Sequence, residues 1–162
     1  MRRDMKDESG ITLVEAMIAI LIMLVGLVGM AQVLAFSVIA SKTYGRDATK
    51  TTAAARDKME ELTGLAFTDV TTDVTVNPPF PATGTGLSAG GSVAPSTPVN
   101  GYVDYLDEAG ARIEAGAASY TRQWQVINES ASLKRIIVSA ASNRSFDYGV
   151  APSTTIVTLK TP

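Results

Sequence analysis

The feature that most constrains this chain of 162 residues is an apolar run near its N-terminus. From Ala16 to Ser41 there is no charged side chain, and Leu, Ile, Val and Met dominate. A helix of ~20 apolar residues crosses a bilayer core of ~30 Å, so the run is long enough to span a membrane. Backbone groups in lipid must satisfy their own hydrogen bonds, because no water reaches them there. The run therefore predicts one transmembrane helix.

A single acidic residue, Glu15, stands at the head of this run. On insertion scales, a carboxylate at membrane depth costs about 2.5–3.5 kcal/mol. An ionisable residue in such a position is by default a functional candidate, and it needs a partner of opposite charge.

Three ordinary explanations of the run compete. A secretory signal peptide has a shorter apolar region of ~7–15 residues, although Val38-Ile39-Ala40 offers a small-residue cut site. A plain single-pass anchor would keep Glu15 at the membrane surface, where its side chain reaches water. A lipoprotein is excluded, because lipidation requires a cysteine and the chain has none.

The segment Gly10 to Glu15, Gly-Ile-Thr-Leu-Val-Glu, resembles the class III signal peptide of type IV pilins and their relatives. In that family, prepilin peptidase cuts after the last glycine of a polar leader and methylates the new N-terminus. The resemblance implies that Gly10 ends the leader, that Ile11 is the methylated start, and that Glu15 is the family's acid. It also implies that Glu15 neutralises the N-terminal amine of a neighbouring subunit, since opposite charges buried together offset each other's desolvation.

Two features depart from the family's usual pattern. The leader, Met1 to Ser9, mixes acidic with basic residues. Gln32 stands where major pilins often carry a proline that kinks the helix. Gly26 and Gly29 offer a softer weak point instead, or else a surface for close helix packing.

Beyond the run, a three- and four-residue period predicts that the helix continues as an amphipathic segment to Thr63, with Gly64 as its C-cap. The charged residues from Arg56 to Glu61 are expected on a solvated face. The apolar face consists of Ala48, Thr51, Thr52, Ala55, Met59 and Leu62.

Residues 65–100 are rich in Thr, Ser, Gly and Pro and predict a long loop, with one short strand through Val70, Val74 and Val76. From Gly101 the period changes to two. Tyr102–Leu106 predicts a strand, Asp107–Gly110 a turn and Ala111–Glu114 its return. Three longer strands are expected at Ser119–Asn128, Leu133–Ala141 and Thr154–Thr161.

Each long strand offers one apolar face to a core. The predicted faces consist of Tyr120, Trp124 and Val126, then Ile136, Val138 and Ala140, and finally Val157 and Leu159. Short connections predict an antiparallel meander, whose apolar face the amphipathic part of the helix would cover.

These elements predict an α+β, pilin-like fold: a long N-terminal helix packed on a small antiparallel C-terminal sheet. The expected boundaries are a leader at 1–10, a helix at 11–63, a connecting loop at 64–100 and a sheet region at 101–162. Within the helix, residues 11–40 form the transmembrane part and residues 41–63 the amphipathic part.

The sequence favours no catalytic chemistry. Without histidine or cysteine, the chain lacks the usual general base and the commonest transition-metal ligands, and no glycine-rich phosphate loop occurs. A net charge of −2 gives no electrostatic footprint for nucleic acid. Asp104, Asp107 and Glu108 gather oxygen ligands of the kind that calcium prefers, but their spacing is that of an exposed turn rather than a calcium loop. We expect no enzyme activity and no cofactor.

The resemblance implies a minor pilin of a bacterial type IV pilus, of the PilV kind, on the strength of Met59-Glu60-Glu61-Leu62 and Arg122-Gln123-Trp124-Gln125-Val126. Its expected partners are prepilin peptidase, other pilin subunits, the assembly platform of the inner membrane and the lipid bilayer. It would cross the inner membrane once before assembly and lie in the fibre, or at the periplasm or cell surface, afterwards. A minor pseudopilin of a type II secretion system shares every one of these features. An exported or membrane-anchored periplasmic binding domain remains the alternative from another class.

Overall fold

The computed structural model describes residues 12–75, 84–94, 96–144 and 149–162. The elements in chain order are α1 (Leu13–Gly64), β1 (Gly90–Gly91), β2 (Val103–Leu106), a 3₁₀ turn (Ala115–Ala117), β3 (Tyr120–Ser130), β4 (Leu133–Ser142) and β5 (Ser153–Lys160). The chain divides into two compact units, Met1–Lys42 and Thr43–Pro162, and α1 contributes to both.

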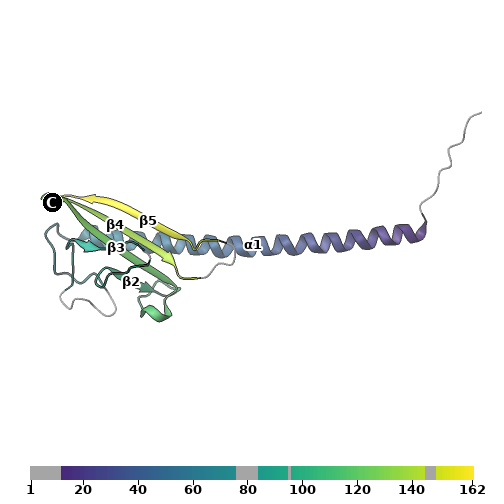
Figure 1. Ribbon diagram of the computed structural model, residues 1–162, viewed down its shortest axis with the longest axis horizontal. Coiled ribbons are helices and arrows are strands. Elements are labelled where there is room, and N and C mark those ends of the chain that lie inside the picture. The colour runs from purple at the N-terminus through teal and green to yellow at the C-terminus, as the bar shows by residue number, and fades with distance from the viewer. Residues whose placement is uncertain (1–11, 76–83, 95, 145–148) are drawn as a thin grey trace, which may run out of the picture. The chain divides into compact units, whose positions relative to one another are not determined.

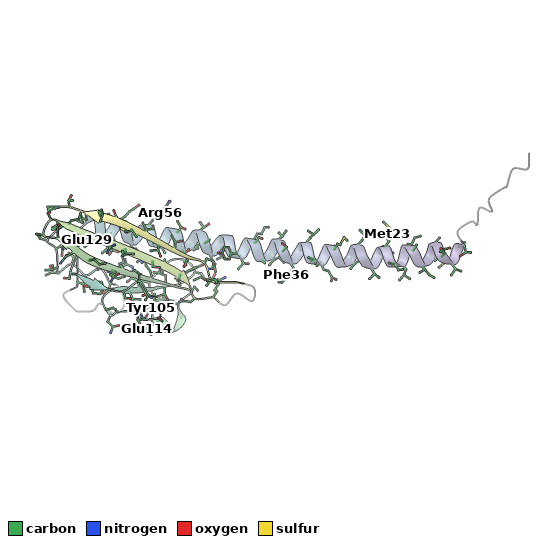
Figure 2. All side chains as sticks on the ribbon, turned by 45° about the horizontal axis from the view of Figure 1, so that its top comes forward. Met23, Phe36, Arg56, Tyr105, Glu114 and Glu129 are labelled. Carbon is green, nitrogen blue, oxygen red and sulfur yellow. The ribbon has the colours of Figure 1, made fainter. Side chains whose placement is uncertain are left out.

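In the first unit, α1 is an apolar helix that nothing in the described chain covers. Every Leu, Ile, Val, Met and Phe side chain from Leu13 to Ile39 is at least 53% exposed. Figure 2 shows two of them, Met23 and Phe36, projecting from the helix. By length and composition this stretch can cross a membrane, with a mean hydropathy of 2.6 over its most apolar window. Exposure of so much apolar surface to water is unfavourable.

In the second unit, β1, β3, β4 and β5 form an antiparallel sheet in that order, and β2 also pairs with β3. The β3–β4 ladder runs from the pair Tyr120–Ser142 to the pair Ser130–Leu133, with a β-bulge near Asn128. The β4–β5 ladder runs from Lys134–Lys160 to Ala141–Ser153. In Figure 1 these three long strands lie alongside the C-terminal part of α1.

The core lies between the sheet and α1. Alternate residues of β3 and β4 point inwards, and Trp124, Ile136 and Val138 are fully buried there. From α1, Ala55 and Leu62 are fully buried against them. Burial of each large aliphatic side chain contributes about 1.5–3 kcal/mol, so this layer stabilises both elements. The predicted helix-on-sheet packing is confirmed. The whole cluster consists of Ala54, Ala55, Met59, Leu62, Val74, Leu87, Tyr102, Leu106, Tyr120, Trp124, Val126, Ile136, Val138 and Ala140.

The prediction that Val157 and Leu159 form the inward face of β5 is wrong. Val157 and Leu159 are 56% and 61% exposed, so they lie on the outer face of the sheet. The opposite face of β5 lies against α1, where the hydroxyl of Thr154 is 3.2 Å from that of Thr51 and 3.1 Å from that of Thr52. On this same inward face, Ile156 packs against the core.

Residues 65–100 were predicted to be a long loop, but parts of this segment are buried in the core. The described residues 70–75 form no strand, yet Val74 is fully buried, and Val76 lies outside the described residues. Further on, β1 pairs with β3 through Gly91 and Gln125. Gly91 has φ +82°, and a Cβ there would stand 2.2 Å from the carbonyl oxygen of Trp124. Only glycine fits so close to the backbone of β3.

The hairpin after β2 is shorter than expected. The predicted return at 111–114 makes a single bridge, Leu106 to Arg112, and one further hydrogen bond from the Ile113 amide to the Tyr105 carbonyl. The turn itself forms where predicted: Asp107 Oδ1 accepts from the amides of Ala109 and Ala111, each at 2.8 Å.

We expect a fragment beginning at Thr43 to fold as a soluble monomer with helical and strand signatures, because it retains the part of α1 that covers the sheet. A fragment beginning at Leu65 should aggregate, since it exposes the inner faces of β3 and β4 to water. Circular dichroism and light scattering measure both outcomes. Equal solubility and equally cooperative melting of the shorter fragment would contradict the packing described above.

Candidate assembly site

The start of α1 is capped by its own sequence. Thr12 Oγ1 accepts a hydrogen bond of 3.3 Å from the amide of Glu15, and the Thr12 carbonyl accepts one of 3.1 Å from the amide of Ala16. Thr12 is therefore the N-cap, and Glu15 occupies the third helical position, the spacing of a capping box. A carboxylate there also lies near the positive end of the helix dipole. Sequence analysis missed this local role of Glu15, although the spacing of Thr12 and Glu15 indicates it.

Of the three predicted site residues, the structure describes one. Glu15 lies in the first turn of α1 with an exposed side chain. No Lys or Arg in the described part of the chain forms an ion pair with it. Gly10 and Ile11 lie outside the described residues.

The expected weak point at Gly26 and Gly29 does not interrupt the helix, because α1 is continuous from Leu13 to Gly64. A Cβ added at either glycine would meet nothing within 4 Å. Together with Val25, Met30 and Val33, the two glycines line a shallow hollow on the helix surface. The hollow is an open surface within the described chain, so it leaves room for the close approach of another helix.

Within the second unit, a buried cluster of charges joins the sheet to α1. Asp104 Oδ2 lies 3.0 Å from Lys58 Nζ and 2.6 Å from an Arg122 guanidinium nitrogen. The three side chains are 1%, 0% and 5% exposed in that order. Arg122 also donates to the Ala54 carbonyl on α1 at 3.0 Å. One carboxylate of β2 thus joins α1 to β3.

Lys58 is the most enclosed member of this cluster. Its ammonium group donates to Glu61 Oε2 at 2.8 Å and to the Val74 carbonyl, and it lies 4.2 Å from the centroid of the Trp124 ring. Glu61 in turn pairs with Arg112 at 3.1 Å. Three cations therefore share two carboxylates. Burial lowers the pKa of Lys58 below its usual 10.5, although the charge of Asp104 acts in the opposite direction.

Two expectations about these residues are wrong. The charged residues of segment 56–61 were predicted to be solvated. Arg56, Asp57 and Glu60 are indeed exposed, but Lys58 is buried. Asp104 lies in a strand, as predicted, but it is buried and faces the helix, whereas it was expected to be exposed with Asp107 and Glu108. Each of the two charges is buried because the other one neutralises it across the core, a contact that local sequence patterns do not contain.

A second buried acid, Asp47 on α1, also went unrecognised in the sequence. Its carboxylate accepts from the Tyr120 hydroxyl at 2.9 Å and from Ser142 Oγ at 3.0 Å. Arg144 stands 3.8 Å from it. Burial, and then the hydrogen bond to Asp47, raises the pKa of Tyr120. Asp47 and Asp104 thus fix the sheet to the helix at two separate points.

The three acids weighed as calcium ligands are each engaged elsewhere. Asp104 belongs to the buried cluster, Asp107 caps its own turn, and Glu108 pairs with Arg46 and Arg144. Among the residues that the structure describes, no group of three or more acidic, His or Cys side chains is arranged to hold a metal ion.

Comparison with known families gives one match. Residues 5–31 match the family model for the prokaryotic N-terminal methylation motif, a stretch that contains Gly10, Ile11, Glu15 and the first turns of α1. No curated protein and no solved structure matches the chain. The match supports a class III signal peptide of the type IV pilin kind. The motif and the long apolar helix behind it are features that type IV pilins and pseudopilins share, and both are consistent with anchoring in the inner membrane.

The buried cluster predicts unequal losses of stability for two substitutions in the fragment that begins at Thr43. Asp104→Asn leaves the buried Arg122 guanidinium without a counter-charge and Lys58 with Glu61 alone, so it should lower the free energy of unfolding by about 3–5 kcal/mol. Lys58→Met leaves Asp104 paired with Arg122 and Glu61 paired with Arg112, so no buried charge is left alone and the loss of stability should be smaller than for Asp104→Asn. Glu108→Gln, in an exposed pair, is the matched control and should change the value by less than about 1 kcal/mol. Urea denaturation measures all three. An equal loss for Asp104→Asn and Glu108→Gln would refute the cluster's role.

The lowered pKa of Lys58 also predicts a dependence of stability on pH. Between the folded pKa and 10.5, the folded chain has released the Lys58 proton while the unfolded chain still binds it. The free energy of unfolding therefore rises with pH across that window. The difference between wild type and Lys58→Met isolates this contribution, and it should shift in favour of wild type as the pH rises towards 10.5. A constant difference would show that Lys58 titrates alike in both states.

Proposed function

We propose that this chain is a minor pilin of a bacterial type IV pilus, of the PilV kind. The observation that carries the proposal is the methylation-motif match over residues 5–31, which runs directly into the uncharged part of α1. A helix whose first part has a largely apolar exposed surface and whose second part covers a sheet suits a subunit that leaves lipid to join other helices.

In this proposal the chain enters the inner membrane with its leader, and prepilin peptidase cuts between Gly10 and Ile11. The new amine of Ile11 is methylated. The assembly platform of the inner membrane then moves the subunit out of the bilayer, where its helix packs with those of other pilin subunits. The folded unit from Thr43 onwards is carried with it to the periplasm or the cell surface.

Glu15 has a distinct part in this sequence of events. In the bilayer, its place in the first turn of α1 keeps the carboxylate near the membrane surface, where it retains water. Within a fibre the carboxylate loses that water, and the Ile11 amine of a neighbouring subunit would offset the desolvation. The capping by Thr12 holds the first turn in place for this contact.

The same observations support a minor pseudopilin of a type II secretion system. Recovery of the protein from surface pili, rather than only from secretion-competent membranes, separates these two functions. The proposal of an exported or membrane-anchored periplasmic binding domain is weaker. Its cut site, Val38-Ile39-Ala40, lies inside a continuous helix, and the motif match favours a different kind of leader.

Substitution of Gly10 should block maturation. Gly10→Val places a branched side chain at the cut, where we expect the peptidase to accept only very small residues, so the full-length form should accumulate in the inner membrane. Electrophoretic mobility of the membrane-bound protein measures the processed fraction. Processing at the wild-type rate would argue against a prepilin leader.

For Glu15, two substitutions separate its charge from its capping position. Glu15→Gln keeps a residue suited to the third helical position, whereas Glu15→Leu does not, and both remove the charge. Both variants should insert and be cleaved normally. Both should enter pili at least about tenfold less than wild type, a factor that corresponds to 1.4 kcal/mol.

The measurement is the ratio of protein in sheared pili to protein in the inner membrane. Glu60→Gln, an exposed acid on the same helix, is the control and should keep the wild-type ratio. A normal ratio for Glu15→Gln together with a low one for Glu15→Leu would assign Glu15 to capping alone and refute its assembly role.

A further inference from the structure

A stripe of positive charge follows the apolar run of α1 directly. Lys42, Arg46 and Lys50 stand four residues apart, so they lie along one side of the helix. Like charges at this spacing repel each other and destabilise a helix. Asp47 is the one acid among residues 42–50, and it is buried against the sheet. An anion beside these three cations, which we call the basic stripe, would therefore stabilise this part of α1.

One residue of the basic stripe, Arg46, shares an anion with a cation that follows the sheet. The Glu108 carboxylate pairs with Arg46 at 3.3 Å and also with Arg144, which lies just beyond the end of β4. The side chains of Arg46 and Glu108 are more than half exposed, and that of Arg144 is 31% exposed. Solvent thus reaches two guanidinium groups that converge on one carboxylate. Guanidinium groups bind phosphate with the same forked geometry, so a phosphate can compete with Glu108 for both.

The chain itself limits how far these two arginines lie from the apolar run. The run ends at Ser41, and Asp47 already accepts hydrogen bonds from Tyr120 and Ser142 of the sheet. Residues 42–47 span about 9 Å in a helix. Each headgroup layer is roughly 5–8 Å thick, because a bilayer measures ~40–45 Å overall around a core of ~30 Å. If the run spans a membrane, Arg46 and this end of the sheet are therefore tethered within reach of the lipid headgroups.

Two further features favour lipid as the source of the anion. Tyr44 lies between Lys42 and Arg46 in the sequence and is half exposed. Tyrosine is enriched where a transmembrane helix leaves the hydrocarbon, because its ring is apolar and its hydroxyl is polar. In the proposed orientation, the basic stripe also lies on the side away from the cytoplasm, where short flanking segments usually contain few Lys and Arg. Cations in that position indicate a local anion, and the phosphates of the bilayer are the anions that the tether brings closest.

We propose that Arg46 and Arg144 bind the phosphate groups of lipid headgroups while the subunit is anchored in the membrane. This inference rests on the proposed function and adds a lipid-binding site to its membrane stage. A phosphate displaces the Glu108 carboxylate from the two arginines, and the rest of the basic stripe adds attraction of the same sign. When the subunit leaves the bilayer, Glu108 pairs with both arginines again.

The chain has no cysteine, so a single introduced cysteine carries one fluorescent label. Val150→Cys places the label at this end of the folded unit, because Val150 is 86% exposed and lies close in sequence to Pro152, whose carbonyl accepts from the Ser142 amide. Ala131→Cys, in the exposed turn between β3 and β4 at the other end of the sheet, is the matched control. The full-length protein is reconstituted in vesicles of phosphatidylcholine and phosphatidylglycerol that carry a quencher on the lipid headgroup. The label at position 150 should be quenched several-fold more than the label at position 131, and equal quenching would overturn the inference.

Two variants of the Val150→Cys protein separate phosphate binding from mere proximity. Arg46→Gln combined with Arg144→Gln should lower the quenching several-fold, because the phosphate loses both guanidinium groups. Glu108→Gln should raise it, because the two arginines are then released from their carboxylate, and the loss of an exposed pair leaves the fold intact.

Unchanged quenching in the double arginine variant would overturn the inference and leave the proposed function intact. So would lower quenching in Glu108→Gln, which would show that the three side chains only hold this end of the unit together. Absence of the wild-type protein from the inner membrane of its own cells would refute the proposed function itself.

Discussion

The rest of the structure depends on the apolar surface that α1 exposes between Ala16 and Ser41. Within the described chain nothing covers it, and every large hydrophobic side chain there is more than half exposed. Such a helix is stable only in lipid or among other helices. In the proposed function the bilayer meets that requirement first and the other helices of the fibre meet it afterwards, and Glu15 is costly in both places unless a positive charge lies beside it. In this proposal, lipid before assembly and other helices after it each keep the apolar surface of α1 away from water.

The second part of α1 meets a different constraint, because it must hold a small sheet without a disulfide. Apolar burial around Trp124 supplies most of the attraction, and the charges of Asp104 and Asp47 fix the position of the sheet along the helix. A buried ion pair adds little net stability. Any other position of the sheet, however, would leave a buried charge without its partner, which is costly. Within the second unit, the sheet is therefore held against α1 in one defined position.

Much of this fold could be predicted from the sequence, because it depends on local periodicity. An uncharged run identifies the membrane part of α1, and alternation identifies β3, β4 and β5. The errors concern contacts between distant segments. Nothing local distinguishes Lys58, which turns inwards, from Arg56, which does not. Alternation shows that β5 has two faces, but both carry aliphatic residues, and only contacts with distant segments place Thr154 and Ile156 inwards and Val157 outwards. At the candidate site, Gly10, Ile11 and Glu15 were proposed from a family resemblance, whereas the capping by Thr12 could have been predicted from its spacing to Glu15.

The N-terminus of the protein recovered from its own cells tests the central claim most directly. Mass spectrometry of the N-terminal peptide should show a chain that begins at Ile11 and carries a methyl group on its amine. That result would establish processing as a prepilin, on which the membrane, fibre and Glu15 arguments all depend. A chain that begins at Met1 would indicate a simple anchor, and one that begins at Ser41 an ordinary signal peptide. Either of these would contradict the account.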